Sequence, residues 1–325
     1  MQHSDKNNHS CTFCASRESE AFCEIRDIFG NSYTIQHCLS CGCFYLSPFP
    51  TEQQLRQAYD TSYYGETEQK FSFTLVEKAV DYFRQERARK IVKMLPVGAR
   101  LLDIGCGNGD FLRYVSLCGN YELYGIERDE TAARRARAKA NIHLQTTALM
   151  DGDFEENSFD AITLFHVFEH LTTPAETLRI IQKILKPEGV LILSMPNIGS
   201  WQARIFRGKW LHLDPPRHLV FFEPKTFTAL MGKRSFALRK TSYFSVEQNP
   251  FGLVQSLLNV ASKRREVLFE RLKGNRNYAP EYGGFRVLLQ KCFFVLHFPL
   301  FVVTDMVAAM VGKSATVKFY FINKK

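Results

Sequence analysis

The run LLDIGCGNGD at residues 101–110 decides the fold class of this chain. Apolar residues at its start give way to glycines at every second position, and Phe111, Leu112 and Val115 then follow at helical spacing. This order predicts a buried strand, a tight turn and the start of a helix. Glycines let backbone N–H groups approach a ligand closely, and a helix N-terminus behind them favours an anionic group. The turn is therefore a candidate ligand site.

Two kinds of ligand site use a turn of this type. The dinucleotide fingerprint G-x-G-x-x-G requires a third glycine at position 110, but this chain has Asp110 there and its third glycine one residue earlier. The run D-I-G-C-G-N-G instead resembles motif I of the class I S-adenosylmethionine (SAM) methyltransferases. In that family the acidic residue lies near the methionine amino group of SAM, and the glycines pass beneath its amino-acid part and ribose. The resemblance assigns four residues to the cofactor site: Asp103, Gly105, Gly107 and Gly109.

Two later segments extend this cofactor site. Tyr121–Ile126 is the predicted second strand, and Glu127 follows directly at its tip. A carboxylate at this position can accept both hydroxyls of a ribose, so it indicates a ribose rather than SAM in particular. The loop after the next short strand corresponds to the adenine-binding loop of the resembled family. There, either Asp151 or the backbone around Leu149 and Met150 is the candidate contact with adenine.

The predicted fourth strand, Asn157–Phe165, leads into the run HVFEH at residues 166–170. The order H-x-x-E-H also occurs in inverted zinc hydrolases. Here, however, the run follows a strand tip rather than lying within a long helix, and Pro174 soon starts another helix. The run resembles that of a bacterial subgroup of SAM methyltransferases, in which it lies beside the methyl-transfer pocket. The resemblance makes Phe165 a cofactor contact and His166 a candidate catalytic residue.

Strands and helices alternate from Leu101 to Met195, which predicts a doubly wound parallel sheet with its ligand at the carboxyl ends of the strands. The resemblance implies the seven-stranded, Rossmann-like sheet of the SAM methyltransferases. Phe236–Phe244 and Thr316–Ile322 are the expected last two strands. About seventy residues separate them, far more than a hairpin loop needs. We therefore expect a helical insert before the last strand.

Three histidines are candidates for a general base: His166, His212 and His218. The last two lie in residues 200–222, which resemble a subgroup segment that folds over the pocket from the substrate side. Each histidine has an alternative role as a structural hydrogen-bonding residue. We predict His166 and His218 as the catalytic residues.

Two C-x-x-C pairs near the start of the chain predict a metal site: Cys11, Cys14, Cys38 and Cys41. Four thiolates suit tetrahedral zinc, and a site closed by four protein ligands is structural rather than catalytic. Cys23 and Cys43 lie near these pairs and complicate the assignment of the ligands. We expect a zinc ribbon.

The expected domain organisation is a zinc ribbon over residues 1–50, a SAM-binding core with N-terminal lid helices over 51–248, an insert over 249–315, and the last core strand over 316–325. Residues 73–95 have helical periodicity and a basic face. Tyr63 and Tyr64 are candidates for part of the lid, and packing in a linker is the alternative.

The insert contains a basic stretch followed by an apolar one. Its least polar part, Cys292–Val303, contains His297 and Pro299, and we expect it to be too short and too interrupted to span a bilayer. Three roles are open. The stretch can lie in a membrane interface beside the neighbouring cations, roof a pocket for an apolar acceptor, or pack against the sheet or a dimer partner.

Composition limits the partners and the compartment. The net charge of +9 and the pI near 9.1 favour acidic partners such as nucleic acid, anionic lipid or phosphorylated substrates. Residues 1–10 are polar, so we expect no secretory signal. Nine cysteines without an export signal predict a reducing compartment. We expect a cytoplasmic protein, peripheral at the inner membrane face if the insert contacts lipid.

The resemblance and the motifs predict a SAM-dependent methyltransferase with a structural zinc. The expected acceptor is a small molecule, a sugar or glycan, or a lipid-linked compound, methylated at oxygen. One alternative is an RNA methyltransferase, which the ribbon and the basic pI favour and the apolar insert opposes. The other is a SAM-binding protein without turnover.

Overall fold

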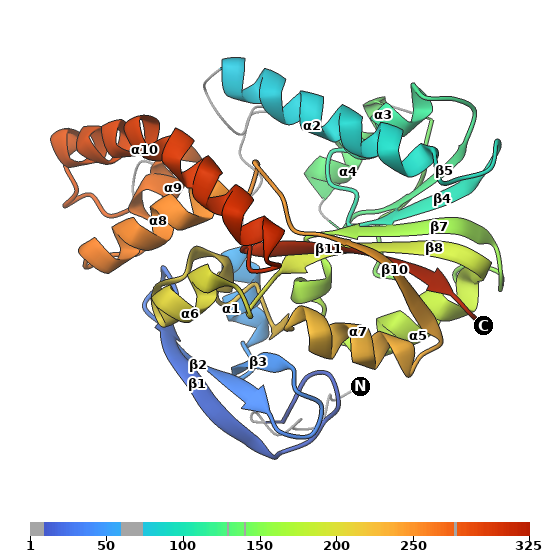
Figure 1. Cartoon of the computed structure of the whole chain (residues 1–325), viewed down its shortest axis with the longest axis horizontal. Coiled ribbons are helices and arrows are strands. Elements are labelled where there is room, and N and C mark those ends of the chain that lie inside the picture. Colours follow the sequence, from blue (N-terminus) through green and yellow to red (C-terminus); the bar gives the residue numbers. More distant parts are fainter. Residues whose placement is uncertain (1–9, 60–73, 129, 140, 276–277) are drawn as a thin grey trace. The chain divides into compact units, whose positions relative to one another are not determined.

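The computed structural model of the chain describes residues 10–59, 74–128, 130–139, 141–275 and 278–325 (Figure 1). Tyr63 and Tyr64, the candidate lid residues, lie outside this part. The chain forms two compact units. The sheet unit comprises residues 73–195, 228–241 and 318–325, and the ribbon unit comprises residues 1–72, 196–227 and 242–317.

The sheet unit is built on a seven-stranded sheet of strand order β10-β11-β8-β7-β4-β5-β6. Its strands are β4 (Arg100–Ile104), β5 (Glu122–Ile126), β6 (His143–Gln145), β7 (Phe159–Phe165), β8 (Leu185–Pro196), β10 (Phe236–Ser242) and β11 (Thr316–Asn323). The pairs β4–β5, β4–β7, β5–β6 and β7–β8 are parallel. The strand β11 lies between β8 and β10 although a long insert precedes it. The predicted fold class is therefore confirmed.

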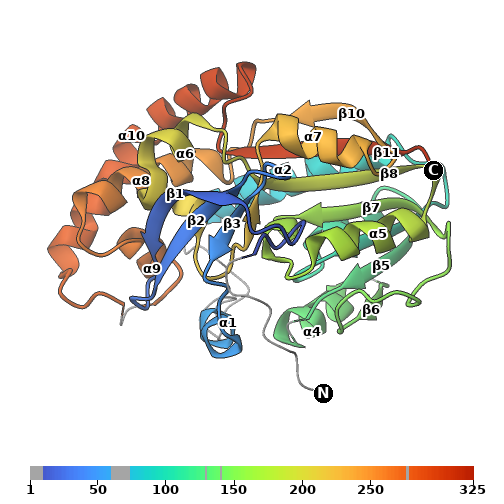
Figure 2. The ribbon, with the colours of Figure 1, turned by 90° about the horizontal axis from the view of Figure 1, so that it is seen from below.

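Helices cover both faces of this sheet. They are α2 (Thr74–Val92), α3 (Asp110–Ser116), α4 (Glu130–Lys139), α5 (Pro174–Ile184) and α7 (Pro224–Gly232). Figures 1 and 2 show α2 and α3 on one face and α5 on the other. Leu101 of β4 is fully buried between the layers, in one cluster with Ile91 of α2 and Leu112 of α3. A central parallel strand is buried on both faces, which explains why its sequence is an unbroken apolar run.

The ribbon unit contains a second sheet of four strands: β1 (Ser19–Arg26), β2 (Ser32–Cys38), β3 (Phe44–Ser47) and β9 (Val220–Phe221). The short β9 pairs antiparallel with β3, so that Phe44 lies opposite Phe221. Residues 196–227 thus group with the ribbon, although we expected them in the core. As domain boundaries, the expected limits at residues 50, 248 and 315 stay a prediction.

Helices make up the rest of the ribbon unit. They are α1 (Glu52–Ala58), α6 (Trp201–Phe206), α8 (Asn249–Ala261), α9 (Val267–Leu272) and α10 (Gly284–Met310), with short 3-10 turns at Arg207–Lys209 and Leu211–Leu213. The buried Arg265 joins three distant segments, because its guanidinium donates to the carbonyls of Arg26, Gly208 and Trp210 at 3.1–3.3 Å. Its charge is balanced by Glu266 at 2.7 Å. The insert is thereby fastened to the ribbon.

The expectation of an interrupted apolar stretch is wrong. The helix α10 runs for 27 residues without a break and contains Pro299 in its interior. Pro299 removes one backbone hydrogen bond and its ring crowds the carbonyl of Val295, but the helix continues through it to Met310. By length and composition α10 is long and apolar enough to cross a membrane, and 17% of its most apolar part is buried.

Candidate functional site

The glycine-rich turn after β4 brings an open backbone to the carboxyl edge of the sheet. Gly105, Gly107 and Gly109 all have positive φ, between 55° and 73°. A Cβ at Gly107 would have no atom within 4 Å, so the space above this residue is open. At Gly109 a Cβ would lie 3.0 Å from the Cα of Ala136 in α4. Gly107 therefore leaves room for a ligand, and Gly109 allows α3 and α4 to pack closely.

Glu127 lies directly after β5 and closes one side of this turn. Its carboxylate is nearly buried, with 6% of the residue exposed, and Oε2 accepts a hydrogen bond from the Gly107 N–H at 2.8 Å. The backbone N–H of Glu127 is held in turn by the carbonyl of Gln145 at 3.0 Å. The carboxylate thus lies where the sequence predicts it, beside the glycine-rich turn.

Asp103, in β4, is buried before the same turn. The Thr163 hydroxyl on the neighbouring strand β7 donates to Asp103 Oδ1 at 2.6 Å. Burial raises the pKa of Asp103 to about 7, whereas the Thr163 hydrogen bond and the charge of Arg87 act in the opposite direction. A buried carboxylate of this kind favours a cationic partner, because a nearby positive charge restores its ionised form.

Arg87 of α2 is a site residue that the sequence does not single out. Its guanidinium carbon lies 4.9 Å from the centre of the Phe165 ring, and Phe111 contacts the same ring edge-on at 5.0 Å. A cation over an aromatic face is a stabilising contact. The basic face of residues 73–95 is the only signal for Arg87 in the sequence, and it does not distinguish Arg87 from the other cations there.

The predicted adenine loop has a defined hydrogen-bonding pattern. The Met150 N–H donates to Asp153 Oδ2 at 2.7 Å, and the Met150 side chain is exposed. Asp151 is paired with Arg179 at 2.7 Å and with Lys183 at 2.9 Å. Hydrogen bonds from these two cations lower the pKa of Asp151 to about 2. The Asp151 carboxylate is thus engaged by α5, and contact of Leu149 and Met150 with adenine stays a prediction.

His166 lies at the tip of β7 and forms a pair with a buried acid. Its Nδ1 is 3.3 Å from Oε1 of Glu169, which is 1% exposed, whereas the His166 side chain is 29% exposed. Glu169 belongs to the 3-10 turn Phe168–His170. The backbone of His166 has a positive φ of 56° and its N–H donates to the Ser194 carbonyl at 2.9 Å. The pair can therefore orient a partly accessible imidazole.

His218 belongs to the ribbon unit and has a different environment. Its Nδ1 lies 2.8 Å from the His212 carbonyl, and its Nε2 lies 3.7 Å from a carboxylate oxygen of Asp214. Both ring nitrogens thus face protein groups, and the residue is 8% exposed. His166 lies in the other unit, and joint action of the two histidines stays a prediction.

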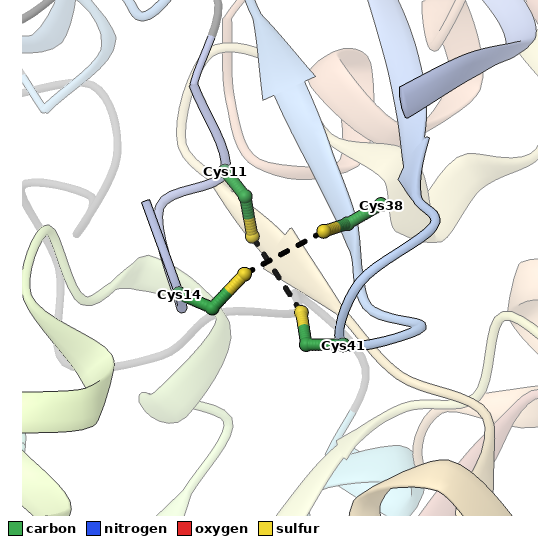
Figure 3. A group of neighbouring side chains, drawn as sticks. All are labelled: Cys11, Cys14, Cys38 and Cys41. Atoms are coloured by element: carbon green, nitrogen blue, oxygen red, sulfur yellow. Dashed lines mark hydrogen bonds between the residues drawn. The ribbon is translucent and has the colours of Figure 1, made fainter. Parts of the chain in front are cut away.

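The four predicted metal ligands meet in the ribbon unit (Figure 3). The four Sγ atoms lie within 4.8 Å of one another, with Cys11–Cys41 at 3.7 Å and Cys14–Cys38 at 3.6 Å. Zinc–sulfur bonds of about 2.3 Å in a tetrahedron place the sulfurs roughly 3.8 Å apart. The geometry therefore fits a single zinc ion. Figure 3 shows the two ligand pairs approaching from separate loops of the ribbon.

A fifth thiol, Cys43, lies against this group. Its Sγ is 3.2 Å from that of Cys11 and 3.3 Å from that of Cys41. Hydrogen bonds from Cys41 and Cys43 lower the pKa of Cys11 to about 2, and the bond with Cys11 raises the pKa of Cys43. Cys43 therefore lies within hydrogen-bond distance of two of the four predicted metal ligands.

Comparison with known families gives one match. Residues 78–241 match a family described as methyltransferase domain. A ubiquinone biosynthesis O-methyltransferase of Neisseria meningitidis is 31% identical over 136 residues, which are 39% of this chain and 54% of the relative. A 2-phytyl-1,4-naphtoquinone methyltransferase of Trichormus variabilis is 31% identical over 124 residues, 35% of this chain and 54% of the relative. The chain spans about half the length of these curated relatives.

Solved structures share the fold at low sequence identity. A Galdieria sulphuraria protein described as a sarcosine dimethylglycine methyltransferase has a TM-score of 0.52 and 16% identity, over 82% of this chain and 97% of its own. The cyclase SpnF has a TM-score of 0.51 and 18% identity, over 84% of this chain and 96% of its own. At these identities the similarity concerns the fold alone.

The glycine-rich turn predicts a difference in stability between two alanine variants. Gly107→Ala should lower the free energy of unfolding by about 1–2 kcal/mol, because only the left-handed backbone is strained. Gly109→Ala should cost roughly 1–3 kcal/mol more, because its Cβ also meets the backbone of α4. Urea unfolding of both variants tests this difference, and equal losses would contradict the packing role of Gly109.

Proposed function

The chain belongs to the methyltransferase-domain family, and from this premise we propose that it transfers the methyl group of SAM to an oxygen atom of a small-molecule acceptor. The observation that carries the proposal is the open backbone of Gly107 between two buried carboxylates, Asp103 and Glu127. A sulfonium nucleoside has a ribose and an amino-acid part with an ammonium group, and these two groups match the two carboxylates. When bound, SAM supplies a methyl group that its sulfonium charge already activates.

The residues around the turn have distinct tasks in this proposal. Glu127 accepts the ribose hydroxyls, and the backbone of Gly107 passes beneath them. Asp103 holds the amino group, whose positive charge keeps the buried carboxylate ionised. The charge of Arg87 acts on Asp103, and its guanidinium attracts the carboxylate of the amino-acid part. Leu149 and Met150 border the adenine, and Phe165 borders the methyl group.

Positioning should provide most of the rate, because the methyl group needs no further activation by the protein. A hydroxyl acceptor is weakly acidic and requires a base. We assign this role to His166, because its ring is partly accessible and Glu169 orients it. His218 is the second candidate, acting from the substrate side.

The acceptor class rests on the named relatives. One is named a ubiquinone biosynthesis O-methyltransferase, and another is named a 2-phytyl-1,4-naphtoquinone methyltransferase. This supports a small-molecule acceptor over a glycan or RNA, and it favours oxygen as the methylated atom. Cytoplasmic location stays a prediction.

We further propose that the four cysteines hold a structural zinc ion. Cys11, Cys14, Cys38 and Cys41 are the ligands, and Cys43 donates a hydrogen bond to the thiolates. The proposal is supported by sulfur separations close to those of a tetrahedral site. The ion would close the loops at one end of the ribbon sheet, with no part in the transfer step.

Titration with S-adenosylhomocysteine tests the cofactor site. The protein should bind it, and Glu127→Gln should weaken binding by more than tenfold, since hydrogen bonds to charged groups contribute about 1.5–3 kcal/mol. Glu122→Gln is the matched control, because Glu122 lies at the exposed opposite end of the same strand. Binding should tighten as the pH rises through about 7, where Asp103 ionises. Calorimetry measures all three effects.

Methyl transfer itself requires a second measurement. Incubation with labelled SAM and a fractionated bacterial extract should place the label in the small-molecule fraction. Label in RNA would instead identify an RNA methyltransferase. Binding of the nucleoside without transfer to any fraction would identify a SAM-binding protein without turnover.

The His166–Glu169 pair predicts a base with a defined partner. His166→Ala should reduce kcat by about 10²–10⁴-fold with little effect on the binding of S-adenosylhomocysteine. Glu169→Gln should reduce kcat less and shift the pH profile, because it alters the group that orients the ring. Kinetics across pH with the acceptor found above provide the measurement. Unchanged kcat in His166→Ala, with a loss in His218→Ala, would transfer the assignment to His218.

The ligand set predicts the metal content of cysteine variants. The purified protein should contain about one zinc per chain. Cys14→Ala should lose the ion and melt at a lower temperature, whereas Cys43→Ala should retain it, because Cys43 is a hydrogen-bond donor rather than a ligand. Elemental analysis of protein purified under reducing conditions measures the content. Zinc lost in Cys43→Ala and kept in Cys14→Ala would refute this ligand set.

A further inference from the structure

The helix α10 has one packed face and one apolar exposed face. Its buried residues recur at helical spacing and pack towards α8 and α9, and Phe301 lies in a cluster with Val254 and Leu268. Figures 1 and 2 show α8, α9 and α10 side by side. The opposite face consists of large apolar side chains: Phe285, Leu288, Leu289, Val295, Leu296, Leu300, Val303, Met306, Val307 and Met310. A continuous apolar face of this length marks a binding surface.

All solvent-exposed charged side chains of α10 are positive. Arg286 and Lys291 are exposed, whereas Asp305, the helix's one acidic residue, is 3% exposed. The Asp305 carboxylate is engaged by Asn249 Nδ2 at 3.1 Å and by the Ser314 hydroxyl. The exposed face therefore combines apolar area with positive charge.

A cavity of about 880 Å³ lies where the first turns of α10 face the end of α8. Lys263, Arg264 and Arg286 line it together with Leu258, Leu289 and Tyr282. One carboxylate, Glu281, also faces the cavity and lies 3.0 Å from Arg264. The cavity lining thus combines three cations and one anion with apolar side chains such as Leu258 and Leu289. This combination fits the phosphate and first acyl carbons of an anionic phospholipid.

We propose that the α8–α10 face of the ribbon unit docks onto an anionic membrane surface. The exposed side chains of α10 enter the boundary between headgroups and acyl chains, and the cavity receives a lipid phosphate. Amphipathic helices with apolar and basic groups bind membranes in this way. Docking brings the whole enzyme to the surface where acceptors with lipid tails reside.

Two features favour a helix lying in the interface over one that spans the bilayer. A spanning helix has lipid on all sides, but one stripe of α10 packs on α8. Its last two turns also contain the buried Asp305, and α10 ends six residues before β11 begins. At the other end Val287 is buried, and the hydroxyl of Tyr282, just before the helix, accepts a hydrogen bond from the Lys263 N–H at 3.1 Å. Both ends of the helix are thus tied to the folded unit, on one side of the membrane.

Charge complementarity also favours a membrane over a second copy of the chain. A symmetric contact would place the exposed face of α10 against itself, and that face offers no acidic group to pair with Arg286 and Lys291. Anionic lipid provides the opposite charge along the whole helix.

Flotation of the full-length protein tests the proposal. The probes are vesicles of phosphatidylcholine and vesicles in which about a third of the lipid is phosphatidylglycerol. The protein should float with the anionic vesicles and bind neutral ones much more weakly. Leu296→Glu should weaken binding by at least about tenfold. Lys263→Glu with Arg286→Glu should weaken it by at least about thirtyfold, because each cation removed costs roughly fivefold and each new carboxylate adds repulsion.

Matched controls separate these effects from a general change in solubility or charge. Leu117 is 72% exposed and Leu296 is 75% exposed, so Leu117→Glu in the sheet unit should bind as the natural chain does. Arg134→Glu with Arg137→Glu on α4 controls for net charge. Circular dichroism verifies folding of each variant, which is expected because all these side chains are exposed.

Three outcomes would overturn the proposal. They are failure of the natural protein to bind anionic vesicles, undiminished binding by both α10-face variants, and a dimer that Leu296→Glu dissociates while no vesicle binding occurs. The last outcome would assign the face to a second copy. None of these results depends on whether the protein binds SAM, so this proposal and the proposed function fail separately.

Discussion

The candidate site depends on the hydrogen bond from the Gly107 N–H to Glu127 Oε2 at 2.8 Å, which fixes the carboxylate beside the glycine-rich turn. The N–H groups of Gly105 and Cys106 also donate to the Ile126 carbonyl, at 2.7 and 3.0 Å. A carboxylate buried this deeply must be hydrogen-bonded, or its desolvation would cost several kcal/mol. The parallel register, with Ile104 opposite Ile126, brings the turn after β4 and the tip of β5 to the same edge. These hydrogen bonds then hold the turn against the strand, and the left-handed glycine leaves the space beyond it open. Carboxylates, open backbone and aromatic ring therefore converge on one edge because the strands are parallel.

The residues of the glycine-rich turn and of the adjacent strand ends were predictable from the sequence. Strand periodicity, glycine spacing and a carboxylate after the second strand predict Asp103, Gly107 and Glu127 at one edge, because parallel strands all end there. Arg87 was not predictable, since it lies on a helix with several equivalent cations and is selected only by its contact with Phe165. The role of Glu169 likewise depends on a 3.3 Å distance to His166 that no spacing rule gives.

The ribbon unit shows the same limit at a larger scale. Its cysteines are predictable because two short, local loops carry them. The strand β9 has only two residues, too few for any periodicity, and its pairing with β3 joins positions about 175 residues apart, a contact of the non-local kind. The role of Arg265 is also not predictable, because in the sequence it is one cation of a basic stretch. In the fold its guanidinium donates hydrogen bonds to three carbonyls of two other segments. Long-range polar contacts of this kind depend on the completed fold.

The insert between β10 and β11 explains how a sheet of this family can carry a membrane-directed surface. Closing a longer loop costs little additional entropy, about 0.6 kcal/mol for each doubling of its length. The base of the insert is also fastened: Asn249, at the start of α8, hydrogen-bonds to Tyr243, Ser314 and Thr316 at 2.8–3.1 Å. The hydrogen bonds of Asn249 thus join the two ends of the insert within the ribbon unit, independently of the packing among the insert's helices. Because this closure is independent of the exposed face of α10, that face is free to serve a partner rather than the fold.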